Sequence, residues 1–172
     1  MDWPAIAVAL GTWALVLITL ALVLITRRIA KEQVKVELYL KLREGFDGAR
    51  IMAARKALAH QLLNKAPHHE IQEDVMDFFE DMGMLLRRRY VDGDMVWDTF
   101  SYYGMGWWSA CKDYAAEERR RHGDPTLFTG FEDLAKQIRR RAVEGLQKAD
   151  LTPPEVEAFL KDEARLPTRQ TS

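Results

Sequence analysis

The chain has 172 residues, of which 30% are charged and 48% hydrophobic, and its formal net charge is -1. These values are typical of a globular protein and exclude a disordered or fibrous chain. They also argue against nucleic-acid binding driven by bulk charge, which needs an excess of Lys and Arg. The single cysteine, Cys111, excludes an intrachain disulfide and a zinc site built from several cysteines.

The first predicted element is an apolar helix. Residues 4–26 contain no charged side chain, and every Lys and Arg lies at Arg27 or beyond. A helix of this length reaches about 34 Å, enough to cross a hydrocarbon core of about 30 Å. The start of the chain is acidic at Asp2, unlike the basic start of a cleaved signal peptide. We therefore expect an uncleaved membrane anchor over residues 1–28, with its span at 4–26.

The flanking charges predict the direction of this anchor. Basic residues beside a span are retained on the cytoplasmic side, and here Arg27 and Arg28 follow the apolar run. We expect the N-terminus outside and the remainder of the chain in the cytoplasm. Trp3 would then lie at the outer interface of the lipid bilayer, where amphipathic rings are favoured.

Two patterns within the span are typical of helix association. Ala7 and Gly11 form a small-xxx-small pair, which permits close approach of two backbones. Thr12, Thr19 and Thr26 repeat at heptad spacing and could form hydrogen bonds between helices. The alternative is that the threonine hydroxyls bind carbonyls of their own helix and that this face meets lipid.

Residues 29–48 form the predicted stalk between anchor and domain. Within it, apolar and polar residues alternate over 33–43, which by itself favours a strand. Val34, Leu38 and Leu42 also fall at helical spacing, and no second strand-like segment exists to complete a sheet. We expect the first helix to continue through this region and to end near residues 45–48.

The remaining chain predicts a helical bundle over residues 49–165, with a flexible tail at 166–172. Apolar periodicity and helix-breaking residues indicate helices at 49–65, 70–89, 94–121, from 129 to about 146, and from 152 onward. We expect Asp94 to cap the third of these. Thr129 with Glu132, and Thr152 with Glu155, have the spacing of capping boxes. The expected fold is all-α: a transmembrane helix continuing into a cytoplasmic bundle of about five helices.

Three arginine triplets are the most unusual feature of the domain. If they converged, they could bind lipid headgroups, an anionic ligand or an acidic partner. The alternative is that they have local roles, because two of them fall at helix C-termini, where cations are favoured, and acidic residues stand at pairing distance. The triplets are Arg87, Arg88 and Arg89; Arg119, Arg120 and Arg121; and Arg139, Arg140 and Arg141.

An aromatic stripe follows the predicted helix at 94–121. At helical spacing such a stripe is more often core than ligand pocket, and Trp107 and Trp108 point about 100° apart, so one of them could lie at an interaction surface. Gly104 and Gly106 suggest close packing against another backbone. Cys111 has no base at motif spacing and is expected to be a small buried hydrophobe.

A histidine-rich segment is the best candidate for a metal site. His60, His68, His69 and Glu73 carry suitable ligand atoms for zinc or iron. However, acidic residues in a first helical turn are expected from the helix dipole alone, and no His-Glu-x-x-His pattern is present. We predict no metal site and no cofactor here.

Residues 78–134 contain a pattern of aromatic, glycine and charged residues. Its members are Phe78, Phe79, Glu80, Gly83, Leu85, Asp92, Val96, Trp97, Phe100, Trp107 or Trp108, Arg119, Phe131, Glu132 and Leu134. In this pattern the chain resembles an uncharacterised family of short bacterial single-pass membrane proteins with a helical cytoplasmic domain, which implies an anchor in a bacterial inner membrane. The resemblance implies no activity. It does direct attention to its polar members, Glu80, Arg119 and Glu132, as a buried ion pair or a binding site.

The expected function is that of a non-enzymatic, membrane-tethered interaction or scaffold module. Its partner would be a second copy or another membrane protein, and one variant is an accessory subunit of a bacterial membrane protein complex. The alternative is a membrane-bound effector or sensor that binds an anionic ligand through arginine clusters. A metal-dependent enzyme is the third hypothesis. Nucleophile elbows and phosphate-binding glycine loops are absent from the sequence.

Overall fold

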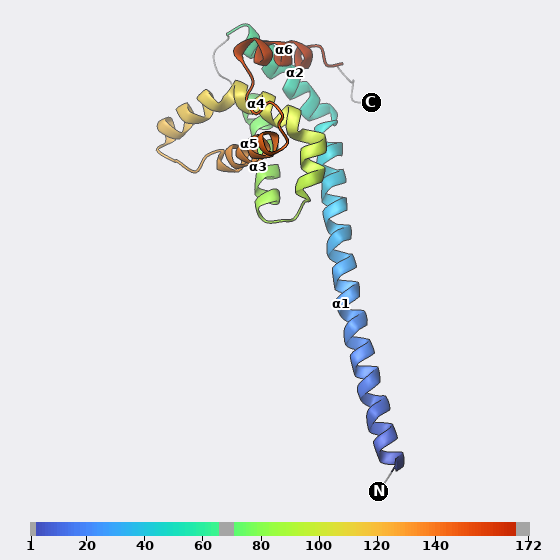
Figure 1. Cartoon of the computed structure of the whole chain (residues 1–172). Helices are drawn as coiled ribbons and strands as arrows, with labels where there is room; N and C mark the ends of the chain where they lie inside the picture. Colours follow the sequence, from blue (N-terminus) through green and yellow to red (C-terminus); the bar gives the residue numbers. More distant parts are fainter. Residues whose placement is uncertain (1–2, 66–70, 168–172) are drawn as a thin grey trace. The chain divides into compact units, whose positions relative to one another are not determined.

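The computed structural model describes residues 3–65 and 71–167, and the side chains of residues 12, 13, 15–65 and 73–167. These residues form six helices and no strand, which confirms the all-α prediction (Figure 1). The helices are α1 (Trp3–Phe46), α2 (Ala49–Leu63), α3 (Ile71–Arg87), α4 (Gly93–His122), α5 (Thr129–Glu144) and α6 (Pro153–Ala164).

The chain divides into two compact units, the N-terminal segment (residues 1–37) and the body (residues 38–172). Within the part of the chain that the structure describes, no helix combines the length and the apolar character needed to cross a membrane. The body begins inside the predicted stalk, because Leu38, Tyr39 and Leu42 pack against its hydrophobic core.

Residues 33–43 are helical, as predicted, and α1 ends at Phe46. The alternating pattern of this segment does not produce a strand, because the described residues offer no second strand with which to pair. Residues of α1 from Leu38 onward are instead stabilised by helix packing. The Tyr39 hydroxyl is 2.6 Å from the Thr99 hydroxyl of α4, and the Tyr39 ring meets Phe100 edge-on.

Capping residues near the helix ends determine where α4 and α6 begin and where α4 ends. Asp92, rather than the predicted Asp94, caps α4 by accepting hydrogen bonds from the backbone N–H groups of Asp94 and Met95. Gly123 ends the same helix in the left-handed conformation, with φ of 63°. The capping box predicted at Thr152 and Glu155 is present at the start of α6.

The capping box predicted at Thr129 and Glu132 is wrong. Phe128 occupies the N-cap position of α5 with φ of 55°, and it makes no side-chain cap. The N–H groups of Gly130 and Phe131 are instead bound by the Glu80 carboxylate from α3, at 2.9 and 2.8 Å. Glu132 is engaged elsewhere, in ion pairs with Arg119 and Lys136. A tertiary contact has therefore replaced a local one.

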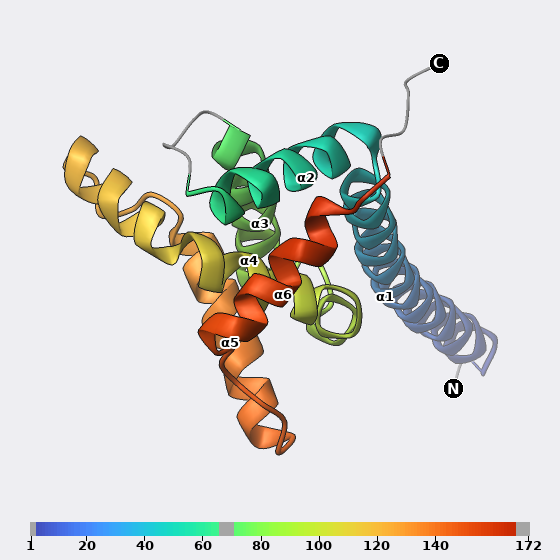
Figure 2. The same cartoon turned by 90° about the horizontal axis from the view of Figure 1, so that it is seen from above.

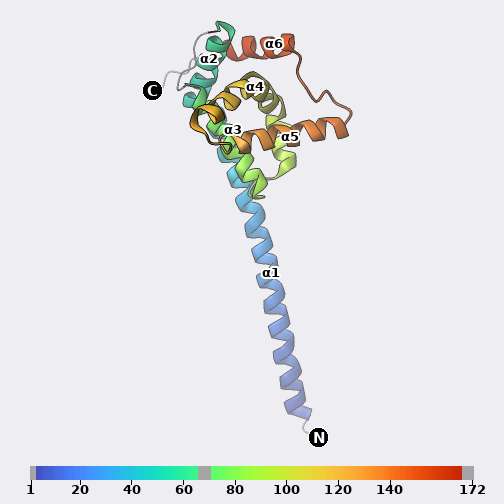
Figure 3. The ribbon, with the colours of Figure 1, turned by 90° about the vertical axis from the view of Figure 1, so that its left-hand side faces the viewer.

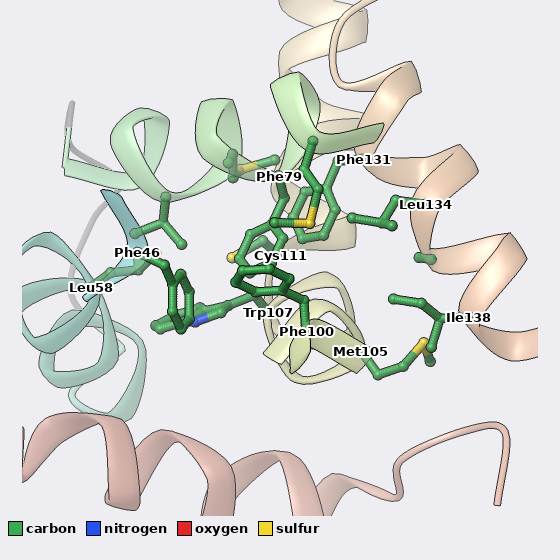
Figure 4. Packing of buried hydrophobic residues seen from close by; sticks show 14 of the residues in the cluster. Phe46, Leu58, Phe79, Phe100, Met105, Trp107, Cys111, Phe131, Leu134 and Ile138 are labelled. Carbon is green, nitrogen blue, oxygen red and sulfur yellow. The ribbon is translucent and has the colours of Figure 1, made fainter. Parts of the chain in front are cut away.

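The core of the body lies where α3, α4 and α5 meet (Figure 4). Phe79 of α3 stacks on Phe131 of α5 with ring centroids 4.8 Å apart, and Phe46 at the end of α1 meets Phe100 edge-on. Trp107 is fully buried. On the other side of α4, α2 and α6 lie alongside each other, as the view in Figure 2 shows.

Glycines allow the closest approaches between these helices. A Cβ atom at Gly83 would overlap the backbone of Gly130, so α3 and α5 touch backbone to backbone at this point. Gly104 and Gly106 also lie at crowded positions, as predicted. Their neighbours are not backbones, however, but the side chains of Ile138 and Phe159.

Candidate functional site

A pocket of about 560 Å³ opens between α3, the C-terminal part of α4 and the loop that connects α4 to α5. Its lining comprises Glu73, Asp77, Glu80, Glu118, His122, Asp124, Thr126, Leu127 and Phe128. Five of these nine side chains are carboxylates, and the three from α3 recur at helical spacing, so they share one face. The pocket is therefore strongly acidic.

The electrostatics of two groups reflect this crowding of negative charge. Burial, together with the neighbouring carboxylates of Glu73 and Asp81, raises the pKa of Asp77 above its ordinary value. Burial and the Glu118 carboxylate raise the pKa of Tyr114 to about 12. A cationic group entering the pocket would relieve this repulsion, so the arrangement suits contact with basic groups rather than with anions.

Part of the negative charge in the pocket is already engaged. Glu118 is almost fully buried and lies 3.1 Å from the His122 ring nitrogen and 3.5 Å from Arg121. Glu80 is committed to the N-terminus of α5, where the positive end of the helix dipole stabilises its charge. Asp124 accepts hydrogen bonds from the backbone N–H and the hydroxyl of Thr126. Glu73 and Asp77 are exposed and have no ion pair among the described side chains, so they are accessible anions.

The three polar residues singled out in the sequence lie together beside this pocket. Arg119 donates to the Leu127 carbonyl at 2.7 Å and pairs with Glu132 at 2.8 Å. The Lys136 ammonium and Arg119 together lower the pKa of Glu132. These contacts fasten the end of α4 to the α4–α5 loop and to the first turn of α5. Arg119, Glu132 and Glu80 thus position the loop that forms one wall of the pocket.

A second buried ion pair was missed by sequence analysis. Arg55 of α2 forms two hydrogen bonds of 2.7 Å with the Glu163 carboxylate of α6, and its guanidinium also lies 3.8 Å from the centre of the Phe46 ring. Both charged side chains are nearly inaccessible to solvent. A signal existed, since Arg55 lies three residues from Met52 and from Leu58 on the apolar face of its helix.

The structure separates the arginine triplets. Those of α3 and α5 lie near the start of α4, where Arg141 pairs with Asp94 at 2.6 Å and Arg87 pairs with Asp133 at 3.3 Å. The triplet of α4 lies in the last turns of this helix, at the end opposite to its start. Most triplet members have local carboxylate partners: Arg119–Glu132, Arg120–Glu117, Arg121–Glu118, Arg139–Asp150 and Arg140–Glu144.

The aromatic stripe belongs to the core. Trp107 is fully buried, with its ring edge-on to Phe159, so it is not available at an interaction surface. Trp108 is partly buried against Phe131. Cys111 is buried, as predicted, and burial raises the pKa of its thiol to about 12. This thiol is therefore a poor nucleophile at neutral pH.

The candidate metal ligands are only partly covered by the structure. His68 and His69 lie outside the described residues, while His60 is exposed on α2 and Glu73 lies on α3. Among the side chains described, no three His, Cys, Asp or Glu groups are arranged to hold a metal ion.

The candidate association residues lie in the N-terminal segment. The side chains of Trp3, Ala7 and Gly11 are outside the described set. The hydroxyls of Thr19 and Thr26 each donate to the carbonyl four residues earlier, at 2.8 Å. Thr12, Arg27 and Arg28 are exposed.

Comparison with known proteins gives a family but no activity. A domain of unknown function, DUF4760, matches residues 5–138, which include nearly all of α1, the whole of α2 to α4 and most of α5. No curated protein and no solved structure matches the chain. Because the family match covers more than half of the sequence, the chain belongs to the DUF4760 family of proteins of unknown function.

Proposed function

We propose that this protein is a single-pass membrane protein whose helical body acts as a non-enzymatic interaction module. The proposal is carried by the uncharged run at residues 4–26, because the structure leaves large apolar side chains within this run exposed. Four successive exposed residues, Leu15, Val16, Leu17 and Ile18, cover a full turn of α1. A helix that is apolar on every face requires an apolar surrounding, which a lipid bilayer provides.

The charge distribution supports a body on the cytoplasmic side of a bacterial inner membrane. Arg27, Arg28 and Lys31 follow the uncharged run, whereas only Asp2 precedes it. Such an asymmetry retains the C-terminal side of a span in the cytoplasm. Trp3 would lie at the outer interface.

The interaction role is supported by the surface of the body. Its pocket is acidic and concave, and Glu73 and Asp77 are free to meet a basic segment of another protein. The partner would be another membrane protein, to which this chain is an accessory subunit, or a second copy of the chain. Within the bilayer, Ala7 and Gly11 would permit close contact with a neighbouring helix.

Fractionation of cells that express the full chain tests the membrane tether. The protein is expected in the membrane fraction, released by mild detergent and not by high salt or alkaline carbonate. Protease added to the outer face of spheroplasts should leave the body intact, and lysis should expose it. Recovery in the soluble fraction without detergent would overturn the tether, and digestion of the body in intact spheroplasts would overturn its orientation.

Cross-linking in membranes, followed by mild detergent extraction, tests the interaction role. A stoichiometric membrane-protein partner or a cross-linked homodimer is expected. Replacing Ala7 and Gly11 with Leu should remove the complex if the span carries the contact, and Glu73→Lys with Asp77→Lys should remove it if the pocket does. Recovery of a lone monomer from the wild-type chain at every cross-linker concentration would contradict the proposal.

A further inference from the structure

The turn between α3 and α4 displays consecutive exposed side chains on a well-defined backbone. The N–H of Arg89 binds the Leu86 carbonyl at 3.0 Å, and the N–H of Tyr90 binds the Leu85 carbonyl at 2.9 Å. This pair of bonds is the Schellman arrangement that ends a helix. Arg88, Arg89 and Tyr90 are exposed. Val91, which is buried, fastens the turn to the core.

The positive charge of this turn is not neutralised locally. Neither Arg88 nor Arg89 has an ion pair among the side chains that the structure describes, in contrast to the partnered members of the other two triplets. The nearby acids are committed, because Asp92 caps α4 and Asp94 pairs with Arg141. The turn therefore offers two free guanidinium groups beside a half-exposed tyrosine ring.

The backbone at Arg89 gives a second reason to examine this turn. Its φ of 59° lies in the left-handed region, which glycine adopts without strain. Glycine is the usual residue at this position of the motif, directly after the helix cap. An arginine here costs stability. Lys65, Phe128 and Leu146 share the positive φ, so the backbone of Arg89 supports a functional hypothesis only together with its exposed charge.

Within the body, the turn lies at the end where the chain comes in from residue 37. Tyr39, the second residue of the body, contacts Thr99 in the second turn of α4, and the α3–α4 turn directly precedes that helix. Helices α2 and α6 lie at the opposite end of the body, as Figure 3 shows. In the sequence, only eleven residues, 27–37, separate the uncharged run from the body.

We infer that the turn formed by Arg88, Arg89 and Tyr90 binds the phosphate groups of anionic phospholipids. This inference rests on the membrane tether proposed above, since the short connection keeps the body close to the bilayer surface. Guanidinium groups form paired hydrogen bonds with phosphate oxygens, and a tyrosine ring is favoured at the headgroup level. The contact would hold the body against the membrane in one orientation.

The experiment uses the full chain reconstituted in liposomes of phosphatidylcholine, with or without phosphatidylglycerol. A fluorophore is attached at Asp98→Cys, an exposed position in the second turn of α4, while the native Cys111 is buried and stays unlabelled. Lipids with a spin-labelled headgroup quench the fluorophore when the turn approaches the surface. Phosphatidylglycerol is expected to increase quenching at least twofold, and salt should reverse the increase.

Two pairs of substitutions with the same change in net charge make the test specific. Arg88→Gln with Arg89→Gln should abolish the increase caused by phosphatidylglycerol. Arg120→Gln with Arg121→Gln, at the distant end of α4, should leave it intact. Equal loss in both pairs, or no effect of phosphatidylglycerol on the wild-type chain, would overturn the inference. Failure of the chain to float with either liposome would overturn the membrane tether, and the headgroup contact with it.

Discussion

Among single residues, Cys111 shows how burial determines chemical reactivity. Its side chain is enclosed by the core, and this burial raises the pKa of the thiol to about 12. Thiolate, rather than thiol, reacts with alkylating reagents and disulfides. Cys111 should therefore remain unmodified by a maleimide or an aromatic disulfide at pH 8 in the folded protein. It should react fully once denaturant exposes the core, which mass spectrometry can follow.

A second, exposed thiol provides the control for this prediction. Lys112 is the next residue in α4 and is exposed, so Lys112→Cys should be modified within minutes under the same conditions. Complete modification of Cys111 in the native protein would show that the core opens readily at α4. The burial of Cys111 followed from the sequence, because an isolated cysteine on an aromatic face has no polar role.

Arg89 has a backbone conformation that lowers the stability of the folded protein. Its φ of 59° places the Cβ atom close to the following carbonyl, which glycine avoids. Arg89→Gly should therefore raise the free energy of unfolding by up to about 1 kcal/mol, despite the greater freedom of glycine in the unfolded chain. Denaturant unfolding of the full chain in mild detergent, followed by tryptophan fluorescence, measures the change.

A variant at the neighbouring Arg88 distinguishes the effect of backbone strain on stability from the effect of charge. Arg88→Gly removes the same charge from the same turn, but Arg88 does not have a positive φ. This variant should be no more stable than the wild type. If both variants raised stability equally, relief of charge repulsion would explain the effect better than relief of strain. The sequence could not reveal this position, because a basic triplet at a helix end is also what the helix dipole favours.

At the scale of elements, the packing of α3 on α5 depends on Gly83. A Cβ atom at this position would overlap the Gly130 carbonyl, which belongs to a backbone that cannot rotate away. Gly83→Ala should therefore separate the two helices and lower the free energy of unfolding by about 1–3 kcal/mol, although alanine is the better helix former. It should also disturb the Glu80 cap on α5, since Glu80 lies one turn earlier.

Gly45 near the end of α1 is the matched control. A Cβ atom there would meet only the Phe78 ring, at an ordinary contact distance of 3.9 Å. Gly45→Ala should leave the stability unchanged or raise it by up to about 1 kcal/mol, as expected from helix propensity. If both substitutions had the same effect, the backbone contact between α3 and α5 would not limit the packing.

The attachment of α6 depends on the pair formed by Arg55 and Glu163. Both charges are removed from water, so each requires the other. Glu163→Gln should leave the Arg55 charge uncompensated and lower the free energy of unfolding by about 3 kcal/mol. The double variant Arg55→Met with Glu163→Leu should recover most of this loss, because an apolar pair can replace a buried ion pair.

An exposed pair in the same helix is the comparison. Glu157 pairs with Lys161 on the solvent side of α6. Glu157→Gln should change stability by less than about 0.5 kcal/mol, since solvent screens exposed ion pairs. A loss from Glu163→Gln no larger than that from Glu157→Gln would show that water reaches the Arg55 pair.

Local sequence patterns predicted the positions of the helices but not the contacts between them. The helix positions could be predicted because helix-breaking and capping residues such as Gly123 and Thr152 act on the residues directly beside them. The cap of α5 could not, because Glu80 lies about fifty residues before the N–H groups that it binds. Arg55 and Glu163 are separated even further, by 108 positions. Spacing rules describe neighbours along one helix, whereas the candidate site is built from contacts between helices.

For the whole molecule, the formal net charge of -1 conceals two separated regions of opposite sign. The pocket on α3 and α4 collects carboxylates, and the α3–α4 turn carries the free guanidinium groups. The composition gives only the near-zero sum of these charges. The positions of the positive and negative side chains on the surface depend on which helix faces pack together. The fold is therefore needed to show that the two kinds of charge lie in different regions.

The acidic pocket makes the stability of the whole chain depend on pH through Asp77. Burial, followed by the Glu73 and Asp81 carboxylates, raises its pKa in the folded state. A carboxyl group of this kind binds its proton more tightly when folded, so folding is favoured below its folded pKa and loses stability as the pH rises through it. Asp77→Asn should therefore raise the unfolding temperature at pH 7. The difference from the wild type should shrink as the pH falls through the raised folded pKa toward the ordinary aspartate value of about 4. Asp113→Asn on α4, an exposed position outside the pocket, should show little change at either pH. A stabilisation by Asp77→Asn that stayed constant down to low pH would indicate a packing effect, because a proton can relieve repulsion only where the carboxyl group titrates.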